Sequence, residues 1–274
     1  LRAPEHGELE VTLGAVAVCH SGISYAAGAW GGTLPAVYGH EAAGKITALG
    51  SAVDGLSLGD SVVVTLIRSC GHCNSCGSGK PTICETNVET SKGPLTTLNG
   101  GILDHGMHCG AFAEKVVVDQ SQVVKIPKSI KFEAASLLAC GVITGIGAVV
   151  NAARVRPGHD VVVIGAGGVG LNTIQGARIA GARRIVALDM TSEKLDIARA
   201  FGATDGILAT QAKPWKDAKA IIGRGADAVW AQTDARPGPQ HTQAQGQRGI
   251  PEAFQRCCHL FGTSSSSTGA IIWI

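Results

Sequence analysis

The sequence predicts an α/β protein whose first half is rich in strands and whose second half forms a doubly wound parallel sheet. Three observations lead to this fold class. Runs of β-branched residues between Gly-rich turns fill the chain up to about residue 127, strands and helices alternate from there to residue 231, and 274 residues suffice for two domains. We predict a first domain at 1–138, a second domain at 139–231 and an atypical tail at 232–274.

The first half contains four extended runs with Gly-rich turns between them and no helical periodicity. We predict strands at Leu9–Val18, within Val37–Leu49, at Ser61–Ile67 and at Phe112–Val118. The segment Ser69–Gly101 is rich in Gly, Ser, Asn and Cys and is predicted to be a loop.

The second half begins with two predicted helices and continues as alternating strands and helices. The predicted strand Asp160–Ile164 is apolar from Val161 onward, as buried parallel strands are. The predicted helices are Phe132–Leu138, Val142–Ala153, Val169–Ala180, Ser192–Phe201 and Trp215–Ile222; the other strands are Arg184–Leu188, Gly206–Leu208 and Asp227–Ala231. The pattern stops after Ala231, and the Gln-, Gly-, Pro- and Ser-rich composition of 232–274 predicts poor order.

Composition and charge restrict the partners that this chain can have. Hydrophobic residues make up 45% of the chain and charged residues 16%, and the net charge is +2. This balance predicts neither a nucleic-acid surface nor a membrane surface, and no apolar run approaches the roughly 20 residues of a membrane span. With no signal-peptide pattern at the first residues, we expect the nine cysteines to bind metal in a reducing cytoplasm rather than form disulfides.

Four cysteines lie close together within the predicted loop. Cys70, Cys73, Cys76 and Cys84 have the spacing C-x2-C-x2-C-x7-C. Four thiolates are typical of a tetrahedral structural zinc, whose binding can supply folding energy that a polar loop lacks. An iron–sulfur cluster also uses four cysteines, and four unrelated buried cysteines are the third interpretation.

Cys19, His40 and Cys140 form a second candidate metal set. Cys19 directly follows the first predicted strand, His40 follows a glycine, and Cys140 lies near the predicted domain junction. Each alone is more often a buried or structural residue. Together they leave a fourth zinc position for water or substrate, where the ion can lower the pKa of an alcohol.

Two neighbours of this set are candidate catalytic residues. Ser21 can accept the alcohol proton and pass it onward, or it can simply cap the next turn. Glu41 can support His40 or bind the ion transiently, or it can be an ordinary surface carboxylate.

A glycine fingerprint follows the apolar strand that ends at Ile164. Gly165, Gly167 and Gly170 fit G-x-G-x-x-G, and Asp189 ends the next predicted strand. The glycines allow a tight turn, a close approach of pyrophosphate and close helix packing, while the Asp189 carboxylate favours NAD over NADP. A Gly-rich turn that binds nothing is the alternative. We also predict cofactor contacts at Gly168, Val169 and His20.

These motifs together resemble the zinc-dependent medium-chain dehydrogenase/reductase family, particularly its alcohol dehydrogenases. The resemblance runs from about Gly14 to Ala231, and 140–153 is similar to the branch of formaldehyde dehydrogenases that act on a glutathione adduct. It implies a GroES-like catalytic domain, an incomplete Rossmann domain for NAD and an active site between them. It also implies catalytic zinc at the Cys/His/Cys set, which is the alcohol dehydrogenase ligand set, and structural zinc at the four-cysteine loop.

The chain departs from the family pattern in several places. Gly22 stands where an Asp usually orients the zinc-binding His, and Ser24 stands where many members have the His that ends the proton relay. The family's earlier first strand and its later cofactor-domain strands are missing. We hypothesise that the tail is a frameshifted or misassembled extension. Reading the coding DNA after Val229 in the other two frames tests this, and the absence of an apolar β/α pattern in both would contradict it.

From these residues we predict an NAD-dependent zinc alcohol dehydrogenase that acts on a small alcohol or aldehyde, with a possible homo-oligomer as the assembly. A truncated zinc-binding remnant with little activity is one alternative. A medium-chain reductase acting on polyols or quinones is the other.

Overall fold

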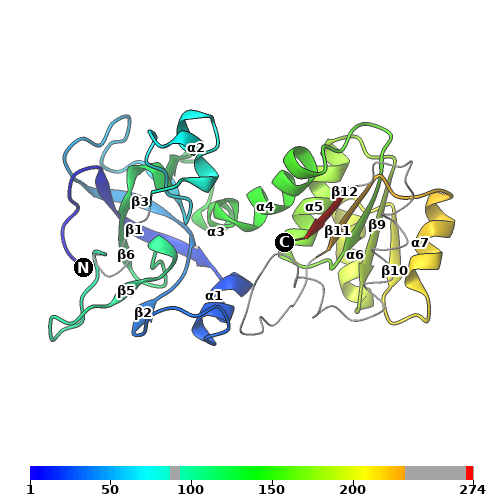
Figure 1. Cartoon of the computed structure of the whole chain (residues 1–274), viewed down its shortest axis with the longest axis horizontal. Coiled ribbons are helices and arrows are strands. Elements are labelled where there is room, and N and C mark those ends of the chain that lie inside the picture. Colours follow the sequence, from blue (N-terminus) through cyan, green and yellow to red (C-terminus); the bar gives the residue numbers. More distant parts are fainter. Residues whose placement is uncertain (87–92, 232–269, 274) are drawn as a thin grey trace. The chain divides into compact units, whose positions relative to one another are not determined.

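The computed structural model describes residues 1–86, 93–231 and 270–273, and it divides the chain into two compact units, Leu1–Cys140 and Gly141–Ile274 (Figure 1). The predicted tail lies outside the described residues except for 270–273. Each unit has its own sheet and its own core.

The first unit is built on a five-stranded antiparallel sheet with the strand order β6-β1-β3-β4-β7. Alternating Val, Leu and Ile side chains on one face pack into a buried cluster, as expected for a half-buried strand. The strands are β1 (Glu8–Ala17), β3 (Glu41–Leu49), β4 (Ser61–Thr65), β6 (Lys115–Asp119) and β7 (Val123–Lys125); a small parallel pair joins β2 (Ala36–Val37) to β5 (Asp104–His105).

The opposite face of this sheet carries α3 (Phe132–Ser136) and the 3-10 turn Leu137–Ala139. Ala135 and Ala139 are buried against Ala43 and Val63. Gly14 of β1 permits this packing, because a Cβ there would lie 2.3 Å from the Phe132 ring. The close fit brings residue 140 back to the sheet.

The first unit also contains helices that periodicity does not predict. α1 (His20–Ala26) and the one-turn α2 (Asn74–Gly77) are too short and too rich in Gly and Ser to show a helical pattern. The predicted strand at Phe112–Val118 begins later, at Lys115, and the run predicted within Val37–Leu49 divides into β2 and β3. Short 3-10 turns cover 81–83, 106–108 and 120–122.

The second unit is a parallel sheet with the strand order β10-β9-β8-β11-β12. The strands are β8 (Asp160–Ile164), β9 (Arg184–Asp189), β10 (Asp205–Leu208), β11 (Ala228–Ala231) and β12 (Ala270–Trp273); the helices are α4 (Gly141–Gly147) with a π-helical continuation at 148–152, α5 (Gly168–Ile179), α6 (Ser192–Phe201) and α7 (Pro214–Ile222). Each predicted strand and helix of this half is present with small shifts at its ends.

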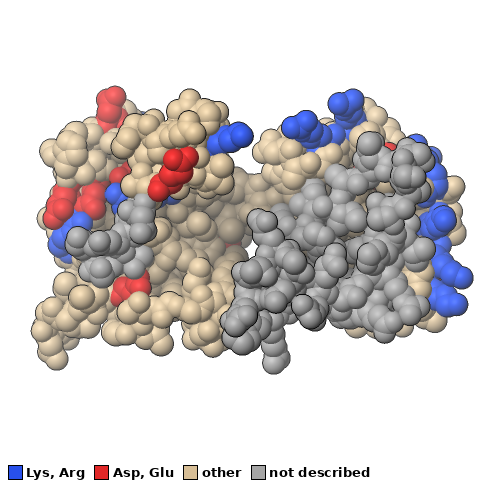
Figure 2. All heavy atoms as spheres, in the orientation of Figure 1, with Lys and Arg blue, Asp and Glu red and all other residues tan. Residues whose placement is uncertain are grey.

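Both faces of this parallel sheet are buried. Val161 and Val163 of β8 pack into the cluster that includes Ile174 of α5, whereas Val162 and Ile164 pack into the cluster on the α7 side. Burial on both faces explains why the strand is apolar from Val161 to Ile164. Lys and Arg side chains gather along the α7 side of the second unit, on its solvent-facing surface (Figure 2).

Across the described residues, no single helix is both long and apolar enough to cross a bilayer. Two helices joined at a bend, Phe132–Ala139 and Gly141–Ala152, pass that test only as a pair and only by length and composition.

Candidate active site and metal centres

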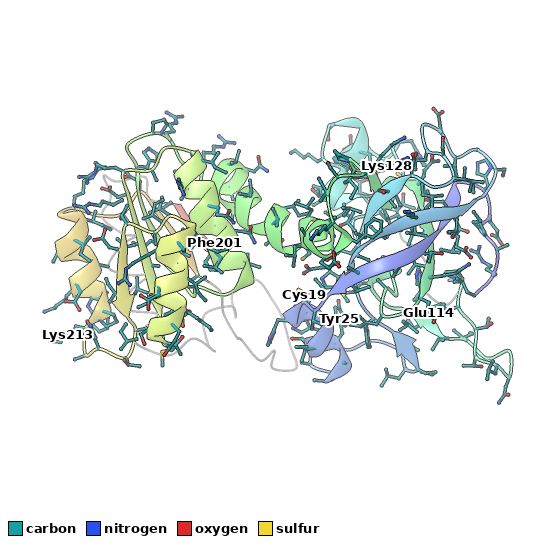
Figure 3. All side chains as sticks on the ribbon, turned by 180° about the vertical axis from the view of Figure 1, so that it is seen from behind. Cys19, Tyr25, Glu114, Lys128, Phe201 and Lys213 are labelled. Carbon is teal, nitrogen blue, oxygen red and sulfur yellow. The ribbon has the colours of Figure 1, made fainter. Side chains whose placement is uncertain are left out.

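Cys19 lies where β1 leads into α1 (Figure 3). It is the residue before the first helical turn and has an extended backbone, with φ −97° and ψ 146°. The neighbouring Cys140 thiol, followed by His40 and Ser21, lowers the pKa of Cys19 to about 3 against the opposing effect of burial. The thiolate is the form that binds a metal.

His40 is held in a buried position by the glycine before it. Gly39 has φ +98°, and a Cβ there would lie 2.6 Å from the Phe112 backbone nitrogen, so the position requires glycine. The Phe112 N–H donates to the Tyr38 carbonyl at 2.8 Å, and the Ala111 N–H donates to the Gly39 carbonyl at 3.0 Å. These two hydrogen bonds hold the segment before His40 in place. The His40 side chain is 2% exposed, and both of its ring nitrogens are buried without a hydrogen-bond partner.

Cys140 follows the 3-10 turn that packs on the outer face of the first sheet. The Thr65 hydroxyl donates a hydrogen bond of 2.9 Å to the carbonyl of Ala139, the residue before Cys140. This hydrogen bond links the residue before Cys140 to β4. Cys140 is the last residue of the first unit.

These elements bring four donor side chains together. One donor atom from each of Cys19, His40, Glu41 and Cys140 lies within 4.8 Å of the others. Glu41 is buried, and burial followed by the nearby Cys19 thiolate raises the pKa of its carboxyl group to about 6. Two soft sulfurs and an imidazole are a donor set that suits zinc, and a buried imidazole without any partner is what metal binding would satisfy.

The four cysteines of the loop also converge. The sulfur atoms of Cys70, Cys73, Cys76 and Cys84 lie within 4.8 Å of one another. Backbone N–H groups point at the sulfurs, from Cys73 to Cys70 at 3.3 Å and from Cys70 to Cys84 at 3.4 Å. This geometry can hold one tetrahedral ion.

Hydrogen bonds and burial shift the pKa values of the loop cysteines in opposite directions. The Thr86 hydroxyl, followed by backbone N–H groups, lowers the pKa of Cys70 to about 5. Burial raises the pKa of Cys76 to about 12. A metal that binds all four sulfurs must therefore displace at least one proton.

The glycine fingerprint forms the turn between β8 and α5. Gly165 has φ +94°, and Gly167 is the residue before the first turn of α5. A Cβ on Gly170 would lie 1.8 Å from the Gly165 carbonyl oxygen, whereas a Cβ on Gly168 would meet nothing within 4 Å. The loop is thus closed on the Gly170 side and open at Gly168 and at the N-terminus of the helix, which favours an anion.

Asp189 ends β9 and lies beside this loop. Its carboxylate accepts hydrogen bonds from the Ala166 N–H at 2.8 Å and the Thr191 N–H at 3.2 Å. The side chain is 7% exposed, and Lys194 is 3.9 Å away. The carboxylate is therefore fixed next to the turn. Of the other predicted cofactor residues, Val169 lies in the first turn of α5, and His20 is an exposed residue at the start of α1.

Comparison with known proteins identifies the family. The model of the alcohol dehydrogenase GroES-like domain matches residues 5–128, and that of the zinc-binding dehydrogenase domain matches 168–235. The crystal structure of an alcohol dehydrogenase zinc-binding domain protein from Burkholderia ambifaria is 30% identical, with a TM-score of 0.82 over 100% of this chain and 78% of that one.

The chain belongs to the zinc-binding alcohol dehydrogenase family. This confirms the resemblance and the fold class predicted from sequence, with a GroES-like domain and a Rossmann-type sheet. Zinc and NAD, predicted from the residues, are typical cofactors of this family.

Two further relatives extend the comparison. The S-(hydroxymethyl)glutathione dehydrogenase of Escherichia coli O157:H7 is 41% identical over 212 residues, which are 74% of this chain and 58% of the relative. A crystal structure described as an NAD-dependent alcohol dehydrogenase is 31% identical, with a TM-score of 0.72 over 86% of this chain and 66% of that one. The chain thus spans somewhat more than half the length of the curated relative.

The two departures from the family pattern lie in α1. Gly22 is buried, and a Cβ there would lie 3.9 Å from the Phe112 ring; the same ring lies 3.0 Å from the Cβ position of Gly39. The Phe112 ring therefore lies near both Gly22 and Gly39, and position 22 offers His40 no carboxylate. Ser24 is partly buried in the same helix.

Sequence reasoning did not identify Thr65 and Gln122 as residues of the site. Gln122 is 1% exposed and donates hydrogen bonds to the Thr65 carbonyl at 3.0 Å and to the His108 carbonyl at 2.9 Å. No local motif marks either residue, since their partners lie 57, 14 and 74 positions away.

Proposed function

We propose that this chain carries the zinc and cofactor sites of an NAD-dependent alcohol dehydrogenase. The reaction is oxidation of an alcohol to an aldehyde or ketone with hydride transfer to NAD, or its reverse. The observation that carries the proposal is the convergence of Cys19, His40 and Cys140, with both His40 ring nitrogens buried and unpartnered.

Cys19, His40 and Cys140 are the proposed ligands of the catalytic zinc, and the four loop cysteines are those of the structural zinc. When bound at a three-ligand site with one open position, zinc lowers the pKa of an alcohol and so favours release of hydride. Glu41 lies beside these donors, where it can support His40 or bind the ion transiently.

Proton removal begins, in this proposal, at the Ser21 hydroxyl. Ser21 follows Cys19 by two residues, close enough for its hydroxyl to contribute to the lowered pKa of the Cys19 thiol. Because Ser24 replaces the usual relay histidine, a proton leaving Ser21 passes to water or to another group of the chain.

The glycine turn is the proposed cofactor site. The open N-terminus of α5 and the exposed Gly168 suit the pyrophosphate, and Asp189 suits the ribose hydroxyls. A fixed carboxylate repels the additional phosphate of NADP. Gly167, Val169 and Gly170 complete the proposed set within the second unit, and the contact predicted for His20 stays a prediction from the sequence.

We further propose a small alcohol or aldehyde as the substrate, a homo-oligomer as the assembly and the cytoplasm as the compartment. The matched dehydrogenases are named for small-molecule substrates, among them the S-(hydroxymethyl)glutathione adduct.

Two measurements test the proposed function. Metal analysis of the full chain is expected to find two zinc ions, and incubation with NAD and a panel of alcohols is expected to produce NADH. Cys19→Ala should abolish NADH formation and remove one zinc. Cys109→Ala is the matched control, because Cys109 is a buried cysteine outside both donor sets.

Zinc binding without NAD binding would favour the alternative, a zinc-binding protein that does not turn over. Full activity of Cys19→Ala would contradict the proposed site.

A further inference from the structure

Three residues in neighbouring strands form a row across the first sheet. Ala17 of β1 pairs with Glu41 of β3, and Glu41 pairs with Thr65 of β4. Cys19 lies two residues after one end of this row, and His40 lies one residue before its centre. Sheet hydrogen bonds therefore fix the first two proposed zinc ligands relative to Thr65.

The third proposed ligand does not lie in the sheet. Cys140 follows a 3-10 turn on the outer face, and the Thr65 hydroxyl reaches that turn by donating 2.9 Å to the Ala139 carbonyl. Ala139 is 2% exposed, so its carbonyl is shielded from water and needs a protein partner. The row thus continues through a side chain to the residue adjacent to Cys140.

Thr65 is itself held in place from the other side. The Gln122 amide donates to the Thr65 carbonyl at 3.0 Å and to the His108 carbonyl at 2.9 Å. Gln122 belongs to the turn that Asp119 caps by accepting a hydrogen bond from the Ser121 N–H at 2.9 Å. Buried, satisfied hydrogen bonds of this kind restrict the positions that a side chain can adopt.

We propose that Thr65 is a positioning residue for the three-ligand metal site. Its hydroxyl fixes the backbone before Cys140, and so sets the distance of the Cys140 sulfur from Cys19 and His40. Thr65 does not touch the ion. The inference rests on the proposed function, since it assumes that these three residues bind zinc.

The test compares metal binding by the full-length wild-type chain, Thr65→Val and Thr65→Ser. Valine has the shape of threonine without the hydroxyl, and serine keeps the hydroxyl. Zinc content and competition with a chelator measure each site, and cobalt substitution adds the absorption spectrum of thiolate-bound cobalt. Thr47→Val is the matched control, because Thr47 lies in β3 with its hydroxyl bonded to Glu10 on the surface.

We expect Thr65→Val to weaken zinc binding at the three-ligand site by about tenfold, the lower end of the effect of removing a supporting hydrogen bond. The zinc affinity of Thr65→Ser should remain within about threefold of the wild-type value, and the affinity of Thr47→Val should equal the wild-type value. The zinc of the four-cysteine loop should be retained in every variant and reports that the first unit is folded. If Thr65→Val loses that zinc, Thr65→Ala replaces it in the comparison.

Wild-type affinity in Thr65→Val would overturn the inference, as would a Thr65→Ser variant that binds as weakly as Thr65→Val. A wild-type chain that binds a single zinc would instead contradict the proposed function, so the two failures are distinguishable.

Discussion

The contact between Gly170 and Gly165 gives a sharp test of the cofactor turn. An ideal Cβ on Gly170 lies 1.8 Å from the Gly165 carbonyl oxygen and 3.2 Å from the Trp230 ring. In Gly170→Ala the distance from the alanine Cβ to the Gly165 carbonyl oxygen must grow to at least 3.0 Å. Because that oxygen belongs to the backbone, it cannot move aside as a side chain can. Overpacking of this kind costs about 1–3 kcal/mol, and rigid backbone on one side with a buried ring on the other argues for the upper end.

Gly168→Ala is the matched control, since its Cβ meets nothing within 4 Å. Its stability should change by less than about 1 kcal/mol, in the stabilising direction, because alanine favours a helix. Thermal unfolding measures both variants, and about 3 kcal/mol corresponds to a Tm lower by about 6–12 °C in a chain of this size. Titration with NAD should show weaker binding by Gly170→Ala, because the turn has to open. A Gly170→Ala variant as stable as Gly168→Ala would refute the packing described for this turn.

Two further predictions concern the ion pairs of the second unit and the cysteine loop. Asp160 is fully buried and accepts hydrogen bonds from Arg183 at 2.6 Å and from Arg224 at 2.9 Å. Asp160→Asn should therefore destabilise the chain by about 1–3 kcal/mol. The loss is smaller than for a fully buried ion pair, because both arginines are half-exposed. Burial acts to raise the pKa of Asp160, but the two arginines hold it below its ordinary value. The stabilisation therefore exists above about pH 4 and is lost as the pH falls through the depressed pKa. In urea unfolding, the difference in stability between wild type and variant should shrink on acidification, and a constant difference would contradict this. Cys84→Ser should remove one of two zinc ions and leave NAD binding by the second unit unchanged, as metal analysis and cofactor titration can check; loss of both ions would show that the two donor sets are not independent.

Features that depend on neighbours in the sequence could be predicted from it. The cysteine loop has a fixed local spacing, and the glycine turn follows an apolar strand, so Cys70 and Gly165 could both be assigned from short motifs. The parallel sheet could also be predicted, because its central strand β8 is buried on both faces and is apolar from Val161 to Ile164.

Other features could not be predicted because their causes are distant along the chain or too short to show a pattern. α1 has seven residues, rich in Gly and Ser; it begins directly after Cys19, and its Gly22 lies near the Phe112 ring, which is distant in the sequence. Thr65 looks like one more β-branched strand residue in sequence, and only the fold shows that its hydroxyl reaches residue 139.

The position of Cys140 at the end of the first unit has a consequence for biosynthesis. All seven proposed zinc ligands lie between residues 19 and 140, and every one belongs to that unit. Domains generally fold as units during synthesis, with the N-terminal one first. A nascent chain that has emerged from the ribosome as far as residue 140 therefore carries every proposed donor for both zinc ions, before translation of the second unit is complete.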